Sequence, residues 1–247
     1  MNINYEKCKK IISLLDSYFQ NEENIAEVEY PSSVVYGSND YFLYMFYSCL
    51  LDYGMRSKIY HQNLIHTYMQ YPYIFNPSYV VTMSEEELKD ILVHHVHPRY
   101  PNVAVKRWIV LSNKLLQYDD LIAYLKKLDS FQALDNFIKS IPGYGQKTGG
   151  LLIRIIYDSN ICNFKYDLEA IPIDRHDIEV SYLTGIVDSD KLSQKEFKIL
   201  SDTYIMVAKD LNFNASIVDR YLWEIGNHFC TKKDCADCPL KNVCRKK

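Results

Sequence analysis

The feature that most constrains this chain is a glycine-punctuated hairpin, IPGYGQKT, at residues 141–148. Apolar residues recur at helical spacing on both sides of it, namely Leu134, Phe137, Ile138 and Ile141 before the turn and Leu151, Leu152, Ile155 and Ile156 after it. Both flanks are therefore predicted to be amphipathic helices. Pro142 ends the first helix by removing a backbone donor, and Gly143 and Gly145 allow backbone angles that a side chain would disfavour.

Such a hairpin is suited to binding an anion. It leaves backbone N–H groups at the start of the second helix, where unpaired donors and the helix dipole favour negative charge. We expect the anion to be a nucleic-acid phosphate, with the Lys147 amine beside it. Taken alone, a Pro-Gly-x-Gly turn is equally typical of a plain connector between helices, so the rest of the chain must decide between the two.

The whole sequence predicts a mostly α-helical globular protein. Its 247 residues are 48% hydrophobic, and segments with a helical period outnumber those with strict alternation. We expect a cytoplasmic protein without a membrane partner, because no uninterrupted apolar run could span a bilayer and the first residues, MNINYEKCKK, do not resemble a signal peptide. The net charge of −3 does not by itself suggest nucleic-acid binding, so local charge would have to provide it.

Other helices follow from the same periodicity. The stretch DYFLYMFYSCLLD, residues 40–52, is apolar almost all round, which predicts a helix at the centre of a bundle. Further helices are expected at residues 5–20, 56–69, 84–93, 105–116, 197–211 and 217–229. Asp174 follows the extended segment Ile171-Pro172-Ile173 and is predicted to cap the helix that begins after it.

Four of the seven cysteines lie close together near the end of the sequence. Cys230, Cys235, Cys238 and Cys244 have the spacing C-x4-C-x2-C-x5-C, which provides four soft thiolate ligands within 15 residues. A reducing compartment disfavours disulfides, so metal ligation is the better interpretation. One compact loop after a helix favours an iron–sulfur cluster over a structural zinc, which usually uses two C-x2-C pairs set further apart.

Three motifs occur in one order along the chain: IPGYGQKTG, IPIDRH and the four-cysteine loop. Together they resemble the helix-hairpin-helix DNA glycosylases of the endonuclease III superfamily, from about residue 40 to the end. In that family a Leu-Pro-Gly-Val-Gly-x-Lys-Thr-Ala hairpin precedes a Val-Asp-x-His segment, and many members end in a [4Fe-4S] loop. Lys147 matches the family's catalytic lysine and Asp174 its catalytic aspartate. The Pro-Ile-Asp-Arg-His form is similar to the 8-oxoguanine glycosylase branch in particular.

The chain departs from the family pattern in three places. Four residues separate the first two cysteines where the family has six, and Gly149 replaces the alanine of the hairpin motif. The gap from Lys147 to Asp174 is also longer than usual. These departures indicate a different geometry of the cluster loop and a divergent pocket wall.

The resemblance implies an all-α fold of two helical domains that flank a DNA-binding cleft. Residues 33–158 would form a six-helix domain with the helix-hairpin-helix, and residues 1–32 and 159–247 a helical domain with the four-cysteine loop. The implied DNA contacts are Gly143, Tyr144, Gly145, Gln146 and Thr148. The four cysteines would hold a [4Fe-4S] cluster, with zinc as the alternative.

The implied activity is base excision by a bifunctional DNA glycosylase and AP lyase. Such an enzyme flips a damaged or modified base out of the duplex. Lys147, as a neutral amine, would attack C1′ and form a Schiff base, Asp174 would stabilise the positive charge on the sugar, and β-elimination would follow. The expected partner is double-stranded DNA, and the expected protein is a monomer in a bacterial or archaeal cytoplasm, associated with the nucleoid.

Two other functions stay open. The first is a monofunctional glycosylase for a mismatched, alkylated or modified base, in which Lys147 only contacts phosphate. The second is a non-catalytic DNA-binding module, in which Asp174 only caps its helix. Four aromatic residues are candidates for stacking on a base or wedging the duplex: Tyr36, Tyr53, Tyr100 and Trp108.

Overall fold

The computed structural model describes residues 2–20, 28–53, 57–162, 171–212 and 214–245. Within these ranges the regular secondary structure is helical, apart from one isolated antiparallel bridge between Ile3 and Val187. The predicted all-α class is therefore confirmed. None of the described helices is long and apolar enough to cross a membrane.

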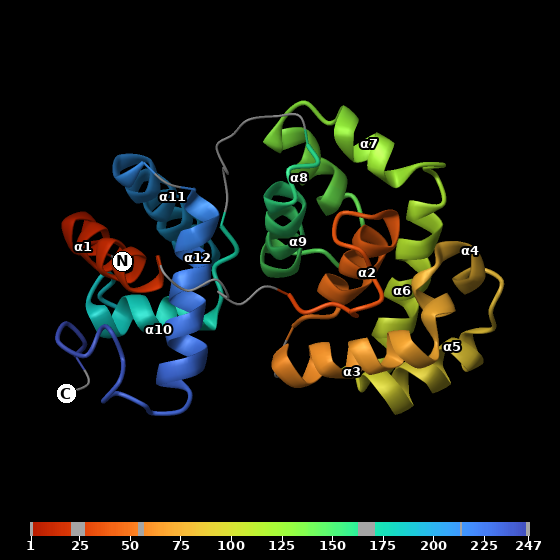
Figure 1. The fold of residues 1–247 in the computed structure, drawn as a ribbon, viewed down its shortest axis with the longest axis horizontal. Helices are drawn as coiled ribbons and strands as arrows, with labels where there is room; N and C mark the ends of the chain where they lie inside the picture. Colours follow the sequence, from red (N-terminus) through yellow and green to blue (C-terminus); the bar gives the residue numbers. More distant parts are fainter. Residues whose placement is uncertain (1, 21–27, 54–56, 163–170, 213, 246–247) are drawn as a thin grey trace. The chain divides into compact units, whose positions relative to one another are not determined.

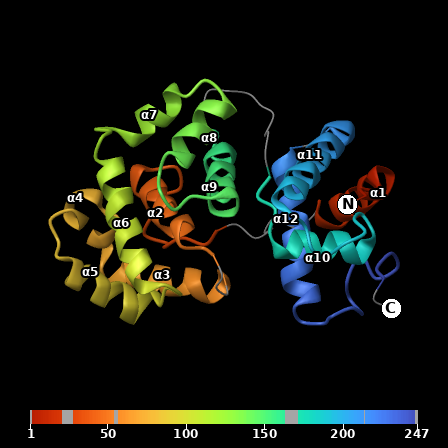
Figure 2. The same cartoon turned by 180° about the vertical axis from the view of Figure 1, so that it is seen from behind.

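The chain divides into two compact units (Figures 1 and 2). The hairpin unit comprises residues 28–166, and the terminal unit comprises residues 1–27 together with 167–247. The two ends of the chain therefore belong to one unit, and the predicted hairpin lies in the other.

A buried helix, α2 (Asn39–Leu50), is the centre of the hairpin unit (Figure 2). It begins after Ser38, whose hydroxyl accepts a hydrogen bond from the N–H of Tyr41. Most of its side chains are buried, as the apolar sequence predicted. Three α-helices pack against it: α6 (Pro101–Leu115), α7 (Leu121–Lys127) and α9 (Gln146–Asp158). The helix that follows the hairpin thus packs directly on the core helix.

Aromatic side chains fill the contact between α2 and α6. Tyr47 stacks on Trp108 with ring centroids 4.6 Å apart, and its hydroxyl lies 2.6 Å from the Ser112 hydroxyl. Trp108 is fully buried, and its indole N–H donates to the carbonyl oxygen of Ile74. The expectation that Trp108 contacts DNA is therefore wrong, because its ring belongs to the core.

Six further elements complete the described part of the hairpin unit. They are α3 (Ser57–Gln70), the 3₁₀ helix η1 (Pro72–Phe75), α4 (Pro77–Val80), α5 (Glu85–Ile91), the π-helix η2 (Leu92–Val96) and α8 (Phe131–Lys139). Residue 56, the predicted start of α3, lies outside the described residues. Ser84 caps α5 by accepting a hydrogen bond from the N–H of Glu87. We did not predict α4, α7 or η1, because such short helices show too little of a hydrophobic period.

The terminal unit joins α1 (Tyr5–Phe19) to four elements from the second half of the chain. These are α10 (Arg175–Thr184), α11 (Gln194–Leu211), α12 (Ala215–Glu224) and the π-helix η3 (Ile225–Cys230). The first helix packs on α11 and α12. Phe19 stacks on Tyr221 with centroids 5.0 Å apart, and the Tyr221 hydroxyl donates to the Asp16 carboxylate at 2.9 Å. These contacts fix the N-terminal helix in the unit.

Candidate functional site

The hairpin connects α8 to α9, as the sequence predicted. The N–H of Tyr144 donates to the carbonyl oxygen of Ile141, and the N–H of Gly145 donates to the Thr148 hydroxyl at 3.1 Å. Gly143 has a φ of +115°, and a Cβ at this position would lie 2.9 Å from Leu50 Cδ1. Both the left-handed backbone and the contact with α2 therefore require glycine at residue 143.

Two of the predicted DNA contacts support the hairpin from the inside. Tyr144 is only 7% exposed, and its hydroxyl donates to the carbonyl oxygen of Phe46 on α2. Thr148 is also buried, and its hydroxyl serves as the acceptor for Gly145. These side chains hold the turn in shape. Of the predicted contacts, Gly145 and Gln146 are exposed.

At Gly145, in contrast to Gly143, neither the backbone angle nor a close neighbour requires glycine. Its φ is −106°, which other residues adopt readily, and a Cβ added to it would meet nothing within 4 Å. Neither the local backbone nor the packing of the hairpin unit accounts for a glycine at this position. The small residue leaves room for another molecule to approach the first turn of α9.

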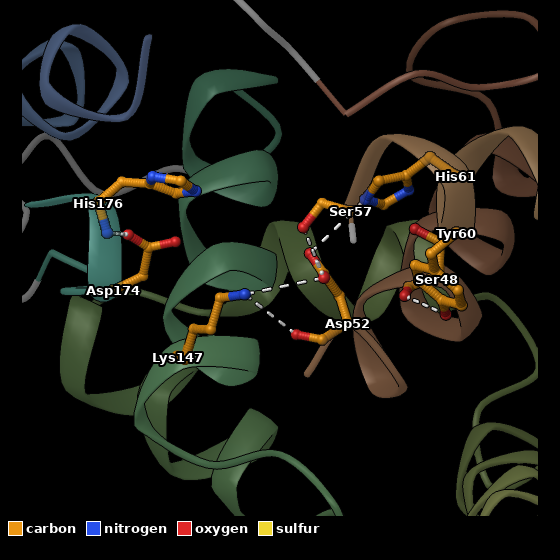
Figure 3. A network of polar contacts seen from close by, with 8 residues as sticks. All are labelled: Ser48, Asp52, Ser57, Tyr60, His61, Lys147, Asp174 and His176. Carbon is orange, nitrogen blue, oxygen red and sulfur yellow. Dashed lines mark hydrogen bonds and ion pairs between the residues drawn. The ribbon is translucent and has the colours of Figure 1, made fainter. Parts of the chain in front are cut away.

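Lys147 is the second residue of α9, and its amine contacts the carboxylate of Asp52, which follows α2 (Figure 3). Its Nζ lies 3.7 Å from Asp52 Oδ1 and donates to the backbone carbonyl oxygen of Asp52 at 3.3 Å. The Lys147 side chain is 36% exposed, whereas that of Asp52 is only 5% exposed. The candidate nucleophile is therefore ion-paired with a buried aspartate that follows the end of α2.

Helix α3 supplies the remaining partners of Asp52. The Ser57 hydroxyl donates to Oδ1 at 3.1 Å, and His61 Nε2 lies 3.5 Å from Oδ2 (Figure 3). Burial alone would raise the pKa of Asp52, but the hydrogen bond from His61 and the charge of Lys147 outweigh that effect, and the pKa is lowered. Asp52 is thus ionised at neutral pH, and it joins α2, α3 and α9 through one carboxylate.

Neither Asp52 nor His61 was identified from the sequence as part of a site. One signal was present, because Asp52 is an acidic residue just beyond the C-terminal end of a buried helix. Negative charge is disfavoured there by the helix dipole and calls for a nearby cation. The sequence did not indicate that Lys147, 95 residues further on, provides it.

Asp174 caps α10 in the terminal unit, as predicted. Its Oδ1 accepts hydrogen bonds from the N–H groups of His176 and Asp177, at 2.6 and 3.3 Å, and its own N–H donates to Asp177 Oδ2 at 2.7 Å. This reciprocal capping box fixes the direction of the Asp174 carboxylate. A catalytic role for Asp174 stays a prediction.

His176 lies against the C-terminal part of the same unit. A Cβ on Gly226 would come within 2.5 Å of His176 Cβ, so only glycine permits this close packing. The imidazole makes an edge-on contact with the Trp223 ring, with centroids 6.1 Å apart. His176 is therefore a packing residue in the terminal unit.

A short series of arginine and tyrosine side chains borders the hairpin. The Arg107 guanidinium lies 4.9 Å from the centre of the Tyr53 ring, which stacks on Tyr100 at 6.3 Å. Arg99 in turn lies over the Tyr100 ring. A Cβ on Gly143 would be 3.0 Å from Arg107 Cδ, so the series reaches the turn itself. It places positive charge and an exposed tyrosine ring next to the hairpin, in a protein whose net charge is negative.

The four cysteines of the C-terminal loop are all within the described residues. Cys235 is exposed, Cys238 is buried, and Cys230 and Cys244 are half-buried. Burial raises the pKa of Cys238, and the nearby thiols of Cys244 and Cys235 raise it further. Among the described side chains, however, no group of three or more His, Cys, Asp or Glu residues is arranged to hold a metal ion. The described thiols of this loop therefore do not form a ligand set as they stand.

Comparisons with known proteins locate the fold. No protein-family model and no curated protein sequence matches the chain. Among solved structures, an endonuclease III trapped as a covalent intermediate with DNA matches with a TM-score of 0.67 and 15% identity, over 99% of this chain and 97% of that one. A thermostable thymine-DNA glycosylase matches with a TM-score of 0.61 and 13% identity, over 97% and 95%. The chain has the fold of these DNA glycosylases.

A third solved structure extends this comparison. The 8-oxoguanine glycosylase/lyase of Methanocaldococcus jannaschii, in complex with DNA containing 8-oxoguanine, matches with a TM-score of 0.56 and 16% identity. The match covers 89% of each chain. At these identities the likeness establishes a shared all-α fold.

The two glycines of the hairpin are predicted to respond differently to alanine. Gly143→Ala should lower the free energy of unfolding by about 1–3 kcal/mol, because it combines a strained φ with a contact against Leu50. Gly145→Ala should change it by less than about 1 kcal/mol, since its φ is ordinary and a Cβ meets no atom. Urea denaturation of the two variants tests this, and equal destabilisation would contradict the placement of the turn.

Proposed function

We propose that this protein is a DNA glycosylase with AP lyase activity, in which Lys147 is the nucleophile. The observation that carries the proposal is the position of Lys147, in the first turn of a helix that directly follows a glycine hairpin. Two neighbours in fold support it, an endonuclease III trapped as a covalent intermediate with DNA and an 8-oxoguanine glycosylase/lyase bound to DNA.

The hairpin and its surroundings would hold the DNA backbone. The first N–H groups of α9 have no partner within the helix by its geometry, and they point toward its positive end. A phosphate placed there would be near Gly145, where the missing side chain allows a close approach. Arg107 and Arg99, held over tyrosine rings, would add charge for neighbouring phosphates.

The chemistry would begin once the target nucleotide has been turned out of the stack. The lone pair of neutral Lys147 Nζ forms a bond to C1′, and the bond from C1′ to the base breaks, so that the base leaves with the electron pair and takes up a proton. Opening of the C1′–O4′ bond with loss of the amine proton gives the imine. Removal of a proton from C2′ then breaks the C3′–O bond and releases the 3′ phosphate.

Asp174 would act electrostatically in this reaction. Two backbone N–H groups fix its Oδ1 at the N-terminus of α10, a position at which the helix dipole favours negative charge. Cleavage of the bond to the base leaves positive charge on the sugar, and a carboxylate fixed in advance stabilises that charge without reorganisation. The role assigned to Asp174 is therefore that of an anion that does not bond covalently.

A monofunctional glycosylase is the second candidate, and the ion pair of Lys147 with Asp52 favours it. An ammonium has no lone pair for attack, so an amine that stays paired with Asp52 would only contribute positive charge. Water would then attack C1′, with Asp174 as the group that stabilises the sugar cation. This enzyme would release a mismatched, alkylated or modified base and leave the strand intact.

We also propose that Cys230, Cys235, Cys238 and Cys244 bind a [4Fe-4S] cluster, with zinc as the alternative. The proposal is supported by four soft ligands within one short loop that follows a helix. The side chains would have to converge further to share one metal centre, since as described they do not form a ligand group. No catalytic step depends on this centre.

Incision of an oligonucleotide with a preformed abasic site tests the lyase without knowledge of the damaged base. We expect the wild-type protein to cut the strand, and Lys147→Gln to lose on the order of a thousandfold or more in rate, because the nucleophile is gone. Lys139→Gln is the matched control, as Lys139 is an exposed lysine of α8 in the same unit. Equal incision by Lys147→Gln would contradict the proposal, whereas base release without incision would favour the monofunctional enzyme.

Metal content tests the four-cysteine loop separately. Protein purified without oxygen should be coloured and should contain about four iron and four sulfide ions per chain. Cys238→Ser should lose them, whereas Cys162→Ser, which changes a half-buried cysteine outside the loop, should retain them. A colourless protein with one zinc per chain would replace the iron–sulfur assignment with the alternative.

A further inference from the structure

The ion pair between Lys147 and Asp52 has a consequence for the state of the nucleophile. The Lys147 amine lies against the C-terminal end of α2, where it meets both the carboxylate and the backbone carbonyl of Asp52. Both groups are acceptors at the negative end of the helix dipole. A charged ammonium interacts favourably with the carboxylate, with the backbone carbonyl and with the negative end of the helix dipole. Nucleophilic attack, in contrast, requires a neutral amine.

Asp52 is ionised at neutral pH, because its partners lower its pKa. An unpaired carboxylate that is only 5% exposed would be strongly disfavoured, so its charge depends on its partners. Ser57 and His61 on α3 supply a hydroxyl and an imidazole, and Lys147 on α9 supplies the opposite charge. The pKa of Asp52 is lowered by these partners in spite of its burial.

Two other titratable groups near Asp52, Tyr60 and Cys49, stay uncharged at neutral pH. Burial, and then the Asp52 charge, raise the pKa of Tyr60 well above its ordinary value, so this phenol stays neutral. Burial followed by the same charge raises the pKa of the Cys49 thiol. The partners that contact the Asp52 carboxylate are therefore Lys147 on α9 and Ser57 and His61 on α3.

We propose that Asp52, held in place by Ser57 and His61, is a positioning residue that docks the Lys147 ammonium at the end of α2 while the protein is free of DNA. This inference rests on the proposed function, in which Lys147 is the nucleophile. The docked amine is a resting state of the nucleophile, and it must leave the ion pair and give up a proton before it can attack. The buried carboxylate thus protects the amine from other electrophiles and fixes its position before DNA binds.

Chemical labelling of lysines in the DNA-free protein tests the docking directly. Asp52→Asn keeps the size of the side chain and one acceptor oxygen, but it replaces the other oxygen with an NH2 donor and removes the charge. We expect Lys147 of this variant to react with an acylating reagent at neutral pH about fivefold faster than in the wild type, as followed by mass spectrometry of its peptide. An unchanged rate for Lys147 in a folded Asp52→Asn protein would overturn the proposal.

Asp135→Asn is the matched control in this experiment. It removes the charge from another aspartate of the hairpin unit, whose Oδ2 is 2.6 Å from the amine of Lys139. Labelling of Lys147 should stay at the wild-type rate in this variant. Faster labelling of Lys147 in both variants would mean that general loosening of the unit, and not loss of docking, exposes the amine, and it too would overturn the proposal.

A second measurement does not require any change to the buried aspartate. In Lys147→Gln, which alters a partly exposed side chain, the pKa of Asp52 should rise relative to wild type because the neighbouring charge is lost. The carboxyl carbon of Asp52 can be followed by NMR as the pH is lowered, and identical titrations would overturn the docking. Neither measurement uses activity, so a failed incision assay would refute the proposed function and leave the docking to be judged by itself.

Discussion

A single buried negative charge organises the hairpin unit. The carboxylate of Asp52 sits just beyond the end of the core helix α2, at a point where the helix dipole is unfavourable to it. It is tolerated because α3 supplies Ser57 and His61 and because α9 supplies Lys147. Removing these partners would leave the buried carboxylate uncompensated, which is the costly case for a group that is only 5% exposed. The Asp52 carboxylate thereby connects α2, α3 and α9.

The hairpin uses the same core helix as its support. Gly143 turns the chain beside Leu50 with a φ of +115°, which disfavours any other residue, and the buried hydroxyl of Tyr144 donates to the Phe46 carbonyl oxygen. Both contacts are made to α2, and Lys147 pairs with Asp52 just beyond the end of that helix. The hairpin and the first turn of α9 are therefore held by α2 and the residues that directly follow it, and the exposed Gly145 lies between Tyr144 and Lys147 in sequence. Proposed phosphate binding and proposed chemistry would share that support.

Local signals in the sequence predicted much of this arrangement. The helical period on both sides of residues 141–148 located α8 and α9, and the all-round apolar character of residues 40–52 identified α2 as buried. The Asp174 cap followed from an extended Pro-containing segment before a helix. Each of these predictions depends on residues that lie within one or two helical turns of one another, so the local sequence is sufficient to make it.

Long-range contacts were the part that the sequence did not predict. Asp52 and Lys147 are 95 residues apart, and their pairing depends on how α2 packs against α9. Tyr144 was expected to face DNA as a turn residue, but its hydroxyl reaches a carbonyl 98 residues away in the chain. Trp108 is a different case, because Val105, Leu111 and Leu115 share its helix face at helical spacing and already indicate a buried position. Only the pairing of Asp52 with Lys147 and the burial of Tyr144 depend on partners distant in sequence.

The most direct test of the account is the site at which the protein bonds to DNA. The wild-type protein would be incubated with an abasic oligonucleotide, the imine reduced with borohydride, and the adduct digested and mapped by mass spectrometry. We predict one modified peptide, with the sugar remnant on Nζ of Lys147. An adduct on another lysine or on the terminal amine, with Lys147 unmodified, would contradict the assignment of the nucleophile.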